Sequence, residues 1–492
     1  MSAALFVVYF YSILVGLLCL MSLMRGSLLI FYFKKNKSEQ TKFISSDPNL
    51  PFVAIQLPIF NEIYVVERLI DSVCRLDYPR EKMEIQILDD STDECSEIIA
   101  RKVSKKKKEG FNIEHVQRPV NIGFKAGALA NGMEKCKCEY IAIFDCDFIP
   151  PTDFLLRALP YFKVDKKVGF IQSSWQHLNY DYSFLTRVQA FGLDAHFTIE
   201  QEGRYKGNLF INFNGTGGIW KKECIEDAEG WQHDTITEDL DLSYRAQLKQ
   251  WKGIYIENLS SPGELPIEMG GFKSQQYRWT KGSAECAKKL IPRTMRSNIS
   301  FKEKIFAFFH LINPIGFILL FLSSVFSVPL LYVKIHYVEF DLFFKMSNIF
   351  LLAFLSLLLF HWIAARTGSH KKMGFWEFVF IFPSFISLNM GLSYFNTLAC
   401  INGFMGRKSP FVRTPKFNLS TGTELLKDKK YFKRKIPRGT FVEILLSIYF
   451  FAGFIYGIQY LELGLSPFHA FLSLGFGMVA VYSLKTVTFK KN

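Results

Sequence analysis

The sequence predicts an α/β domain with a mixed, mostly parallel sheet, inserted between transmembrane α-helices. Two observations predict this fold class. Between residues 51 and 300, short apolar runs rich in Ile alternate with polar stretches patterned like helices, as they do in parallel α/β sheets. On both sides of this region, apolar blocks reach the roughly 20 residues that cross a bilayer. With 49% hydrophobic residues among 492, gathered in such blocks, the chain is neither disordered nor an ordinary soluble enzyme.

The N-terminal block predicts a membrane anchor. Residues 3–33 carry one charge, Arg25, and lysines follow the block while none precedes it. A secretory signal peptide has the opposite order, so we expect a retained transmembrane helix over residues 1–34. A basic linker over residues 35–50 leads into the α/β domain, 51–300, which we expect to end in interfacial helices.

The apolar blocks after residue 300 predict two transmembrane hairpins, over residues 301–366 and 441–492, the second followed by a short tail. Between them, the apolar block 374–404 is interrupted by one Pro and three Asn, and basic residues stand beyond both of its ends. Because positive residues mark the cytoplasmic ends of spans, both ends should lie on the same side. We therefore predict an interfacial or re-entrant helix, with a true span as the alternative. It belongs to a segment, 367–440, that continues as a cytosolic loop and a basic run.

The excess of basic residues fits this topology. With residue 1 outside, the spans place the α/β domain and the C-terminal tail in the cytosol and leave 334–346 and 461–467 as outer turns. The basic run 427–438 then faces anionic lipids, which attract such segments. Membrane lipids thus account for the net charge of +14, and no nucleic acid is expected as a partner. Nine scattered cysteines, with no CxxC pair and His partner, indicate free thiols.

Two acidic motifs stand at the ends of predicted strands, where an open α/β sheet binds its ligand. Asp89 and Asp90 follow the run EIQIL, and Asp145 and Asp147 follow the run YIAIF. Two carboxylates two residues apart suit a divalent metal that bridges a diphosphate. Either motif alone is equally compatible with a structural role, since acidic residues also cap helices.

Two further motifs precede the C-terminal apolar blocks. Glu238 and Asp239 begin a predicted helix, where acids either complement the helix dipole or supply a general base. Gln275, Arg278 and Trp279 form the pattern QxxRW. This pattern suits either an interfacial anchor or a site in which Arg binds pyrophosphate and Trp stacks on a sugar.

The ordered set of acid pair, DxD, TED and QxxRW before membrane spans resembles the family 2 glycosyltransferases, specifically the membrane-embedded processive synthases of the cellulose synthase superfamily. It looks most similar to the mannan and glucan synthase-like branch (cellulose synthase-like A and C) and bacterial relatives, in QLPIFNE at 56–62, LDDSTD at 88–93 and the run from Trp175 through FNGTGGIW at 213–220. The resemblance implies a GT-A fold, a nucleotide-diphosphate sugar donor, Mg²⁺ or Mn²⁺ as cofactor, and inversion at the anomeric carbon.

The resemblance also implies a role for each motif residue. The residues expected to bind the donor are Asp89, Asp90, Lys125, Asp145, Asp147, Thr414 and Lys416, of which Asp145 and Asp147 would hold the metal. The expected catalytic residues are Asp239 as the base, with Glu238, Gln275, Arg278 and Trp279. The residues expected to contact the acceptor are Asn214, Gly215 and Trp279.

Residues 411–416, FVRTPK, resemble the gating loop FxVTxK, which closes over the donor in cellulose synthases. Arg413 stands where that pattern has Val. If the loop acts in the same way here, the substitution Arg413→Val should be tolerated.

The function implied is that of a multi-pass membrane enzyme with a cytosolic catalytic domain, which uses UDP-glucose or GDP-mannose to elongate a β-linked polysaccharide processively. A non-processive transferase that adds one sugar to a membrane lipid is the alternative. A transporter or receptor with a degenerate transferase domain is a third interpretation, from another class. The expected partners are the nucleotide sugar, the growing polysaccharide or lipid acceptor, membrane lipids and an export partner.

Overall fold

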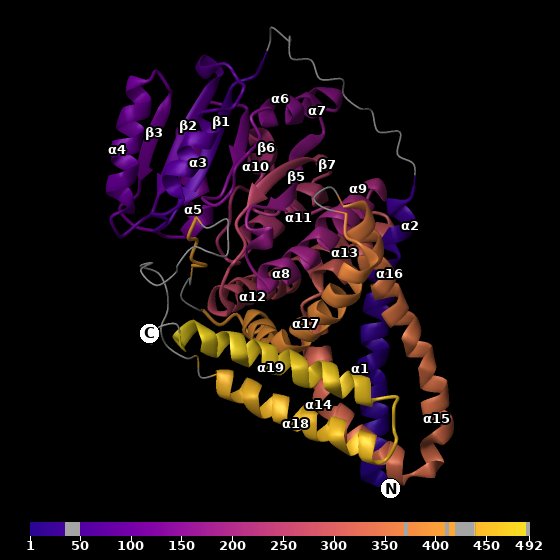
Figure 1. Ribbon diagram of the computed structural model, residues 1–492. Coiled ribbons are helices and arrows are strands. Elements are labelled where there is room, and N and C mark those ends of the chain that lie inside the picture. The colour runs from indigo at the N-terminus through magenta and orange to yellow at the C-terminus, as the bar shows by residue number, and fades with distance from the viewer. Residues whose placement is uncertain (35–49, 369–371, 409–412, 419–436, 438, 489–492) are drawn as a thin grey trace.

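A computed structural model describes residues 1–34, 50–368, 372–408, 413–418, 437 and 439–488 (Figure 1). Four predicted features lie outside these residues: the basic linker apart from Leu50, the start of the gating-type loop at 411–412, the basic run 427–438 apart from Pro437, and the tail lysines Lys490 and Lys491.

A seven-stranded sheet forms the centre of the catalytic region, in the order β3-β2-β1-β4-β6-β5-β7. Neighbouring strands are parallel, except that β6 runs antiparallel to both β4 and β5. The predicted mixed, mostly parallel sheet is therefore confirmed. The strands are β1 (Val53–Ile59), β2 (Met83–Asp89), β3 (Ile113–Gln117), β4 (Tyr140–Ile143), β5 (Val168–His177), β6 (Gly218–Lys221) and β7 (Lys252–Gly263).

Alternation along the strands divides the core into two layers. On β1, Val53, Ile55 and Leu57 face one hydrophobic cluster, whereas Ala54 faces another. The first layer is covered by α3 (Val66–Val73), α4 (Cys95–Lys108), α6 (Phe154–Ala158) and α7 (Pro160–Val164). The second layer is covered by α5 (Phe124–Lys135), α10 (Lys222–Asp227) and α11 (Glu238–Leu248).

The strand order creates a crevice at one edge of the sheet. The chain leaves β1 for β2 and β3 on one side and then returns to β4 on the other side of β1. At such a switch point the connections after neighbouring strands diverge, and ligands of open α/β sheets bind there. The motifs that follow β2 and β4 are thereby brought to one place.

Helices α8 (Phe184–Ala195) and α12 (Met269–Arg296) lie at the lower end of the catalytic region, between the sheet and the apolar helices (Figure 1). A six-residue π-helical turn (His196–Gln201) and α9 (Glu202–Lys206) follow α8, and α13 (Phe301–Leu311) follows α12.

Among the described residues, six helical segments are long and apolar enough to cross a membrane. They are α1 with α2 (Ser2–Gly26, Leu28–Tyr32), α14 (Ile315–His336), the segment Val338–Thr367 with α15 (Asp341–Met346) and α16 (Leu351–Thr367), α17 (Phe375–Phe404), α18 (Gly439–Gln459) and α19 (Ser466–Thr488). Length and composition count α17 with the others, so they do not decide between the interfacial helix and the span.

The structure differs from the sequence prediction at two places in these segments. The apolar block 305–333 is divided between α13 and α14, because the chain turns at Asn313 and Pro314, and proline has no backbone N–H to continue a helix. The predicted outer turn at 334–346 is mostly helical, since it contains the end of α14 and the whole of α15.

The three segments predicted to lie outside meet at one end of the apolar helices. Ala4 and Val8 near the N-terminus form a cluster with Leu330, against which Tyr337 and Leu465 also pack. Figure 1 shows this end farthest from the sheet.

Helix α17 lies along the boundary between the catalytic region and the apolar helices. Near its start, Phe378 packs against Phe191 of α8, with ring centroids 5.9 Å apart. At its end, Lys288 of α12 donates a hydrogen bond to the carbonyl oxygen of Phe404, at 3.0 Å. Both ends of α17 therefore contact helices of the catalytic region.

Candidate active site

One cavity of about 480 Å³ opens at the switch point, between the carboxyl ends of β1, β2 and β4 and helix α12. It contains all the predicted site residues except Asp89. Those that line it are Asp90, Lys125, Asp145, Asp147, Asn214, Gly215, Glu238, Asp239, Gln275, Arg278, Trp279, Thr414 and Lys416. Motifs spread over more than 300 residues of sequence thus converge on one chamber.

Asp89, the other member of the acid pair, is buried and does not line the cavity, and its contact with the donor stays a prediction. Its carboxylate accepts hydrogen bonds from the Ser91 backbone N–H at 2.9 Å and the Ser96 hydroxyl at 2.5 Å, and it lies 2.8 Å from His115 Nε2. Burial alone would raise its pKa, but these bonds lower the pKa to about 2. Asp89 supports the turn, and Asp90 faces the cavity with its carboxylate bound by Arg118.

The two DxD carboxylates are each neutralised by a lysine. Lys125 Nζ lies 2.6 Å from Asp145 Oδ1, and Lys416 Nζ lies 2.5 Å from Asp147 Oδ2. The hydroxyl of Thr216 accepts a hydrogen bond from the Asp145 backbone N–H at 2.8 Å, which fixes the turn after β4. Burial raises the pKa of Asp145, and Lys125 opposes this shift.

This pair of carboxylates fits a hard divalent cation. Asp145 and Asp147 both face the cavity, and each has a lysine beside its carboxylate. Carboxylate oxygens are the donors that Mg²⁺ and Mn²⁺ prefer, whereas a thiolate or imidazole set would favour softer metals. The donor set is therefore the one that a diphosphate-binding metal requires.

The chain after residue 413 is held against the cavity by Glu264, a residue that the sequence motifs did not single out. Its Oε1 accepts a hydrogen bond from the Phe417 backbone N–H at 2.8 Å, and its backbone carbonyl accepts one from Lys416 Nζ at 2.5 Å. Arg278 Nη2 donates to the hydroxyl of Thr414 at 2.9 Å. The gating-type segment is therefore tied both to the end of β7 and to the QxxRW helix.

Asp239 and Glu238 begin α11, as predicted, and both face the cavity. Gly215 packs directly against them: it has a φ of +82°, and a Cβ at this position would lie 2.9 Å from Asp239 Oδ2. Its carbonyl oxygen accepts a hydrogen bond from Lys125 Nζ at 2.8 Å. Only glycine allows this approach without strain.

Both carboxyl groups of the TED motif are poised to bind a proton. Burial raises the pKa of Asp239 and of Glu238, and Lys125 opposes the shift at each. Proton transfer is most efficient when the pKa of the base lies near the working pH. Burial therefore moves the pKa of Asp239 toward the range in which a carboxylate is an efficient general base.

The QxxRW residues lie on one face of α12 and line the cavity. Arg278 is buried enough that its pKa falls to about 10, and it remains a cation at neutral pH. A buried guanidinium beside the DxD turn suits a diphosphate, and the indole of Trp279 offers a flat face to a sugar.

The structure gives Arg413 partners of its own. Its Nη1 lies 2.8 Å from Glu62 Oε2, and it also donates to the carbonyl oxygen of Asn61. Burial raises the pKa of Glu62 to about 8, and Arg413 opposes that shift. The side chain of Asn61 in turn accepts a hydrogen bond from the Thr92 backbone N–H at 2.8 Å. Arg413 therefore links the gating-type segment to the turns after β1 and β2.

These contacts reverse the expectation that Arg413→Val is tolerated. Valine would remove the charged hydrogen bond to the Asn61 carbonyl oxygen, worth about 1.5–3 kcal/mol, and leave Glu62 buried without the cation of its ion pair. We expect the KM for the nucleotide sugar to rise roughly tenfold or more. Steady-state kinetics of the membrane-embedded protein measure this, with the exposed Arg407→Val as control. A donor KM equal to that of the wild type would show that the ion pair does not hold the segment.

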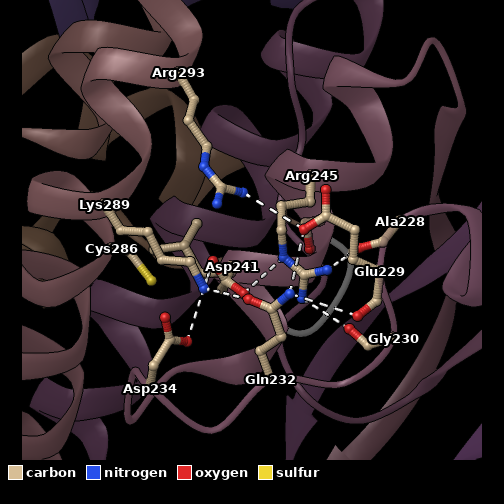
Figure 2. A network of polar contacts seen from close by, with 12 residues as sticks. Ala228, Glu229, Gly230, Gln232, Asp234, Asp241, Arg245, Cys286, Lys289 and Arg293 are labelled. Carbon is tan, nitrogen blue, oxygen red and sulfur yellow. Dashed lines mark hydrogen bonds and ion pairs between the residues drawn. The ribbon is translucent and has the colours of Figure 1, made fainter.

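A buried polar network joins the TED helix to the QxxRW helix (Figure 2). Asp241 lies between Arg245, whose Nε donates to Oδ2 at 2.8 Å, and Lys289 of α12, whose Nζ is 2.9 Å from Oδ1. Lys289 also contacts Asp234 at 2.7 Å, and Arg245 donates to the carbonyl oxygen of Gly230 at 2.9 Å. The two helices that carry the catalytic motifs are thus held by one shared carboxylate.

Asp241→Asn should destabilise the protein. Asp241 is fully buried, so its replacement leaves the buried guanidinium of Arg245 without a counter-charge, which costs about 3–5 kcal/mol. The expected result is a clear fall in the thermal unfolding temperature of the purified protein. Asp234→Asn is the matched control, since the Asp234 side chain is 58% exposed and an exposed ion pair contributes about 0–1 kcal/mol. Equal unfolding temperatures for the two variants would contradict this role of Asp241.

The cavity is also lined by three residues of β5 that the sequence motifs did not assign to the site: Trp175, Gln176 and His177. Trp175 packs edge-on against Phe148, with ring centroids 4.9 Å apart, and His177 Nε2 lies 3.1 Å from Asp194 Oδ1. A partly buried tryptophan and a buried histidine on one strand are ordinary in a core, so residue type gave no sign of their place in the cavity. Their position extends the cavity from the DxD turn toward α8.

Comparison with known proteins gives two family matches that together span most of the catalytic region. Residues 55–222 match glycosyl transferase family 2, and residues 140–365 match glycosyl transferase family group 2. The chain is also 31% identical over 482 residues to glucomannan 4-beta-mannosyltransferase 7 of Arabidopsis thaliana, an alignment that covers 92% of this chain and 83% of that protein.

Other curated relatives are matched over about half of their length. Glucomannan 4-beta-mannosyltransferase 9 of Arabidopsis thaliana is 38% identical over 57% of this chain and 54% of its own. The probable glucomannan 4-beta-mannosyltransferase 7 of Oryza sativa subsp. japonica is 41% identical over 49% of this chain and 42% of its own.

A solved structure shares the fold. The mannosyltransferase PcManGT from Pyrobaculum calidifontis, in complex with GDP-Man and Mn2+, superimposes with a TM-score of 0.51 at 15% identity, over 81% of this chain and 100% of that one. This similarity and the observed sheet confirm the GT-A fold that the resemblance implied. The chain is a glycosyltransferase, and it belongs to family 2, in the branch of the cellulose synthase superfamily that contains the glucomannan 4-beta-mannosyltransferases.

Proposed function

We propose that this protein is an inverting glycosyltransferase that transfers mannose from GDP-mannose to a growing β-linked polysaccharide. One observation carries the proposal: the acid turn after β2, the DxD, the TED pair and QxxRW line a single cavity beside apolar helices. The names of the relatives, which are mannosyltransferases, favour mannose over glucose. UDP-glucose is the other donor to be tested.

The reaction follows from the positions of the side chains. The acceptor hydroxyl oxygen forms a bond to the anomeric carbon, the bond from that carbon to the diphosphate oxygen breaks, and the diphosphate leaves with the electron pair. Asp239 accepts the proton of the hydroxyl. Lys125 and Arg278 stabilise the negative charge that develops on the leaving group. A single displacement inverts the anomeric configuration, and it needs no carboxylate nucleophile.

Asp145 and Asp147 would hold the divalent metal, which is Mg²⁺ or Mn²⁺. When bound there, the cation supplies positive charge to the diphosphate. Thr414 and Lys416 would close the cavity from the other side, as part of the gating-type segment. Asn214 and Gly215 would face the acceptor sugar, with Trp279 beneath it.

The proposed setting is a membrane, with the catalytic domain on the cytosolic side. Six apolar helical segments among the described residues support a membrane protein. The meeting of the N-terminus with both outer turns favours the predicted hairpins, and the contacts at both ends of α17 favour an interfacial helix. Processive elongation is part of this proposal, and it is supported by the packing of α12, which carries the QxxRW residues of the cavity, against the apolar helix α17.

The test is sugar transfer by the purified full-length protein in nanodiscs with Mn²⁺ or Mg²⁺. Radiolabelled GDP-mannose and UDP-glucose are offered separately, and products are sized after extraction of lipids. We expect long, water-soluble, mannanase-sensitive chains from GDP-mannose, with Asp239→Asn as the blank. Label that stays in the lipid extract would instead support the single-addition enzyme. Absence of transfer from either donor would contradict the proposed function.

A further inference from the structure

The only charge in the N-terminal apolar block reaches into the catalytic region. Arg25, near the end of α1, donates from Nη2 to Glu200 Oε2 at 3.0 Å. Glu200 belongs to the π-helical turn His196–Gln201, between α8 and α9, and α2 lies beside α9 (Figure 1). Charges in membrane segments and π-helical turns both tend to mark functional positions. We therefore infer that the contact between Arg25 and Glu200 does more than anchor α1.

A chain of hydrogen bonds continues from Glu200 to the cavity, and its direction is fixed. The Asn212 backbone N–H donates to Gln201 Oε1 at 3.3 Å, so Gln201 Nε2 is the donor to Asn214 Oδ1 at 2.6 Å. Asn214 Nδ2 must then donate to His196 Nε2, at 3.2 Å. An accepting Nε2 places the histidine proton on Nδ1, which faces Glu200 Oε2 at 3.3 Å.

The chain ends at the wall of the cavity beside the proposed base. Asn214 lines the cavity, and the next residue is Gly215, whose carbonyl oxygen binds Lys125 and whose Cα adjoins Asp239. Each link uses both hydrogen-bonding sides of its side chain. The orientation of the Asn214 carboxamide is therefore set from behind, by residues that do not line the cavity.

The charges at the far end make the arrangement stiff. Glu200 has a side chain only 11% exposed, and Arg204 Nε, on a side chain 5% exposed, lies 3.6 Å from Glu200 Oε1. Buried groups that have charged partners on two sides do not reorient freely. Arg25, at 35% exposure, closes the cluster from the apolar helix.

We propose that Arg25, Glu200 and His196 are positioning residues, which hold the Asn214 carboxamide toward the acceptor sugar and tie the acceptor side of the site to the first apolar helix. The inference rests on the proposed function, in which Asn214 faces the acceptor. It predicts that breaking the chain weakens acceptor use while the donor half of the site stays intact.

Three variants and one control test this in the full-length protein in nanodiscs. Glu200→Gln and Arg25→Met break the chain, and Arg25→Lys keeps its charge. Lys334→Met is the matched control, because Lys334 of α14 forms an ion pair with Glu462 at the opposite end of the apolar helices. GDP-mannose is the donor and mannohexaose the acceptor.

We expect the KM for mannohexaose to rise by about tenfold in Glu200→Gln and Arg25→Met. The KM for GDP-mannose and its hydrolysis without acceptor should stay at the wild-type level, and Arg25→Lys should restore acceptor use. A merely structural role would lower both activities together, and that result would overturn the proposal. If Glu200→Gln does not fold, Arg25→Met decides, since its side chain is the more exposed.

Hydrogen exchange of the backbone amides at 212–217 gives a second readout that needs no substrate. Exchange should increase in both chain-breaking variants and not in Lys334→Met. Unchanged exchange would contradict the inference even if the kinetics changed. This arm also separates the two proposals: a wild-type protein that transfers no sugar contradicts the proposed function, whereas exchange at 212–217 still decides the positioning role.

Discussion

Asp239→Asn is expected to lower the rate of sugar transfer by on the order of 10²-fold or more while nucleotide-sugar binding is kept. The amide has nearly the same shape but cannot accept the hydroxyl proton. Asp239 lies against Gly215 and near Lys125, and it does not belong to the DxD pair that would bind the diphosphate through a metal. The loss should therefore appear in kcat and not in the KM for the donor.

The measurement is steady-state transfer in nanodiscs, with donor affinity measured separately by calorimetry. Asp234→Asn, on the exposed loop before α11, is the control for a general effect of charge removal. Glu238→Gln distinguishes the two acids of the motif, since both face the cavity. A wild-type rate for Asp239→Asn, with a large loss in Glu238→Gln, would move the role of base to Glu238.

The pH dependence of the transfer rate in the wild type should also show that Asp239 acts as the base. The pKa of Asp239 is raised by burial, so its carboxyl becomes protonated at higher pH than an ordinary aspartate, whose pKa is about 3.9. Only the deprotonated form accepts a proton, so the rate falls as the pH drops through the raised pKa and is constant above it. The acid limb of the profile should disappear in Asp239→Asn.

The second large effect is expected from Asp147→Asn. Removing one of two carboxylates from the DxD turn should weaken metal-dependent donor binding and cost roughly 10²-fold or more in rate, because a metal contributes several kcal/mol of charge stabilisation. Lys416 would also lose its ion pair at 2.5 Å, so the gating-type segment would be held less firmly. Both consequences weaken the binding of the nucleotide sugar.

Calorimetric titration of GDP-mannose with Mn²⁺ and with EDTA measures this effect. The wild type should bind more tightly with Mn²⁺, and Asp147→Asn should show little difference between the two conditions. Asp153→Asn is the control, because Asp153 lies six residues further on and its carboxylate is 41% exposed. Full metal-dependent binding by Asp147→Asn would exclude Asp147 as a metal ligand.

The fold class and the motifs were predictable because they depend on local patterns. Alternating apolar residues give β1 and its neighbours two buried faces, and the acidic turns stand at the strand ends whatever the rest of the chain does. The antiparallel strand β6 was not predictable, since four residues, Gly218–Lys221, carry no periodic signal. The turn at Asn313 and Pro314 was hidden for another reason: a proline is tolerated inside a transmembrane helix as well as at its end.

In the site, too, some features could be predicted from the sequence and others could not. Its acidic residues, its Arg and its Trp could be named from sequence, but their partners could not. Arg413 contacts Asn61 across 352 positions and Lys416 contacts Asp147 across 269, and such pairs follow from the path of the chain alone. Asp89 lost its place in the cavity because Ser96 and His115, both outside its motif, occupy its oxygens.

The sequence by itself therefore determined which chemistry this protein can perform and between which kinds of segment it is placed. Residue type and spacing set the strands, the apolar blocks and the order of the motifs. Only the tertiary structure decided which charges neutralise one another, that Asp90 and not Asp89 faces the cavity, and that Arg25 at the end of the first apolar helix is linked through Glu200 to Asn214. The physical reason is that ion pairs and hydrogen bonds act over about 3 Å. Groups that are far apart in the sequence reach this distance only after the chain has folded.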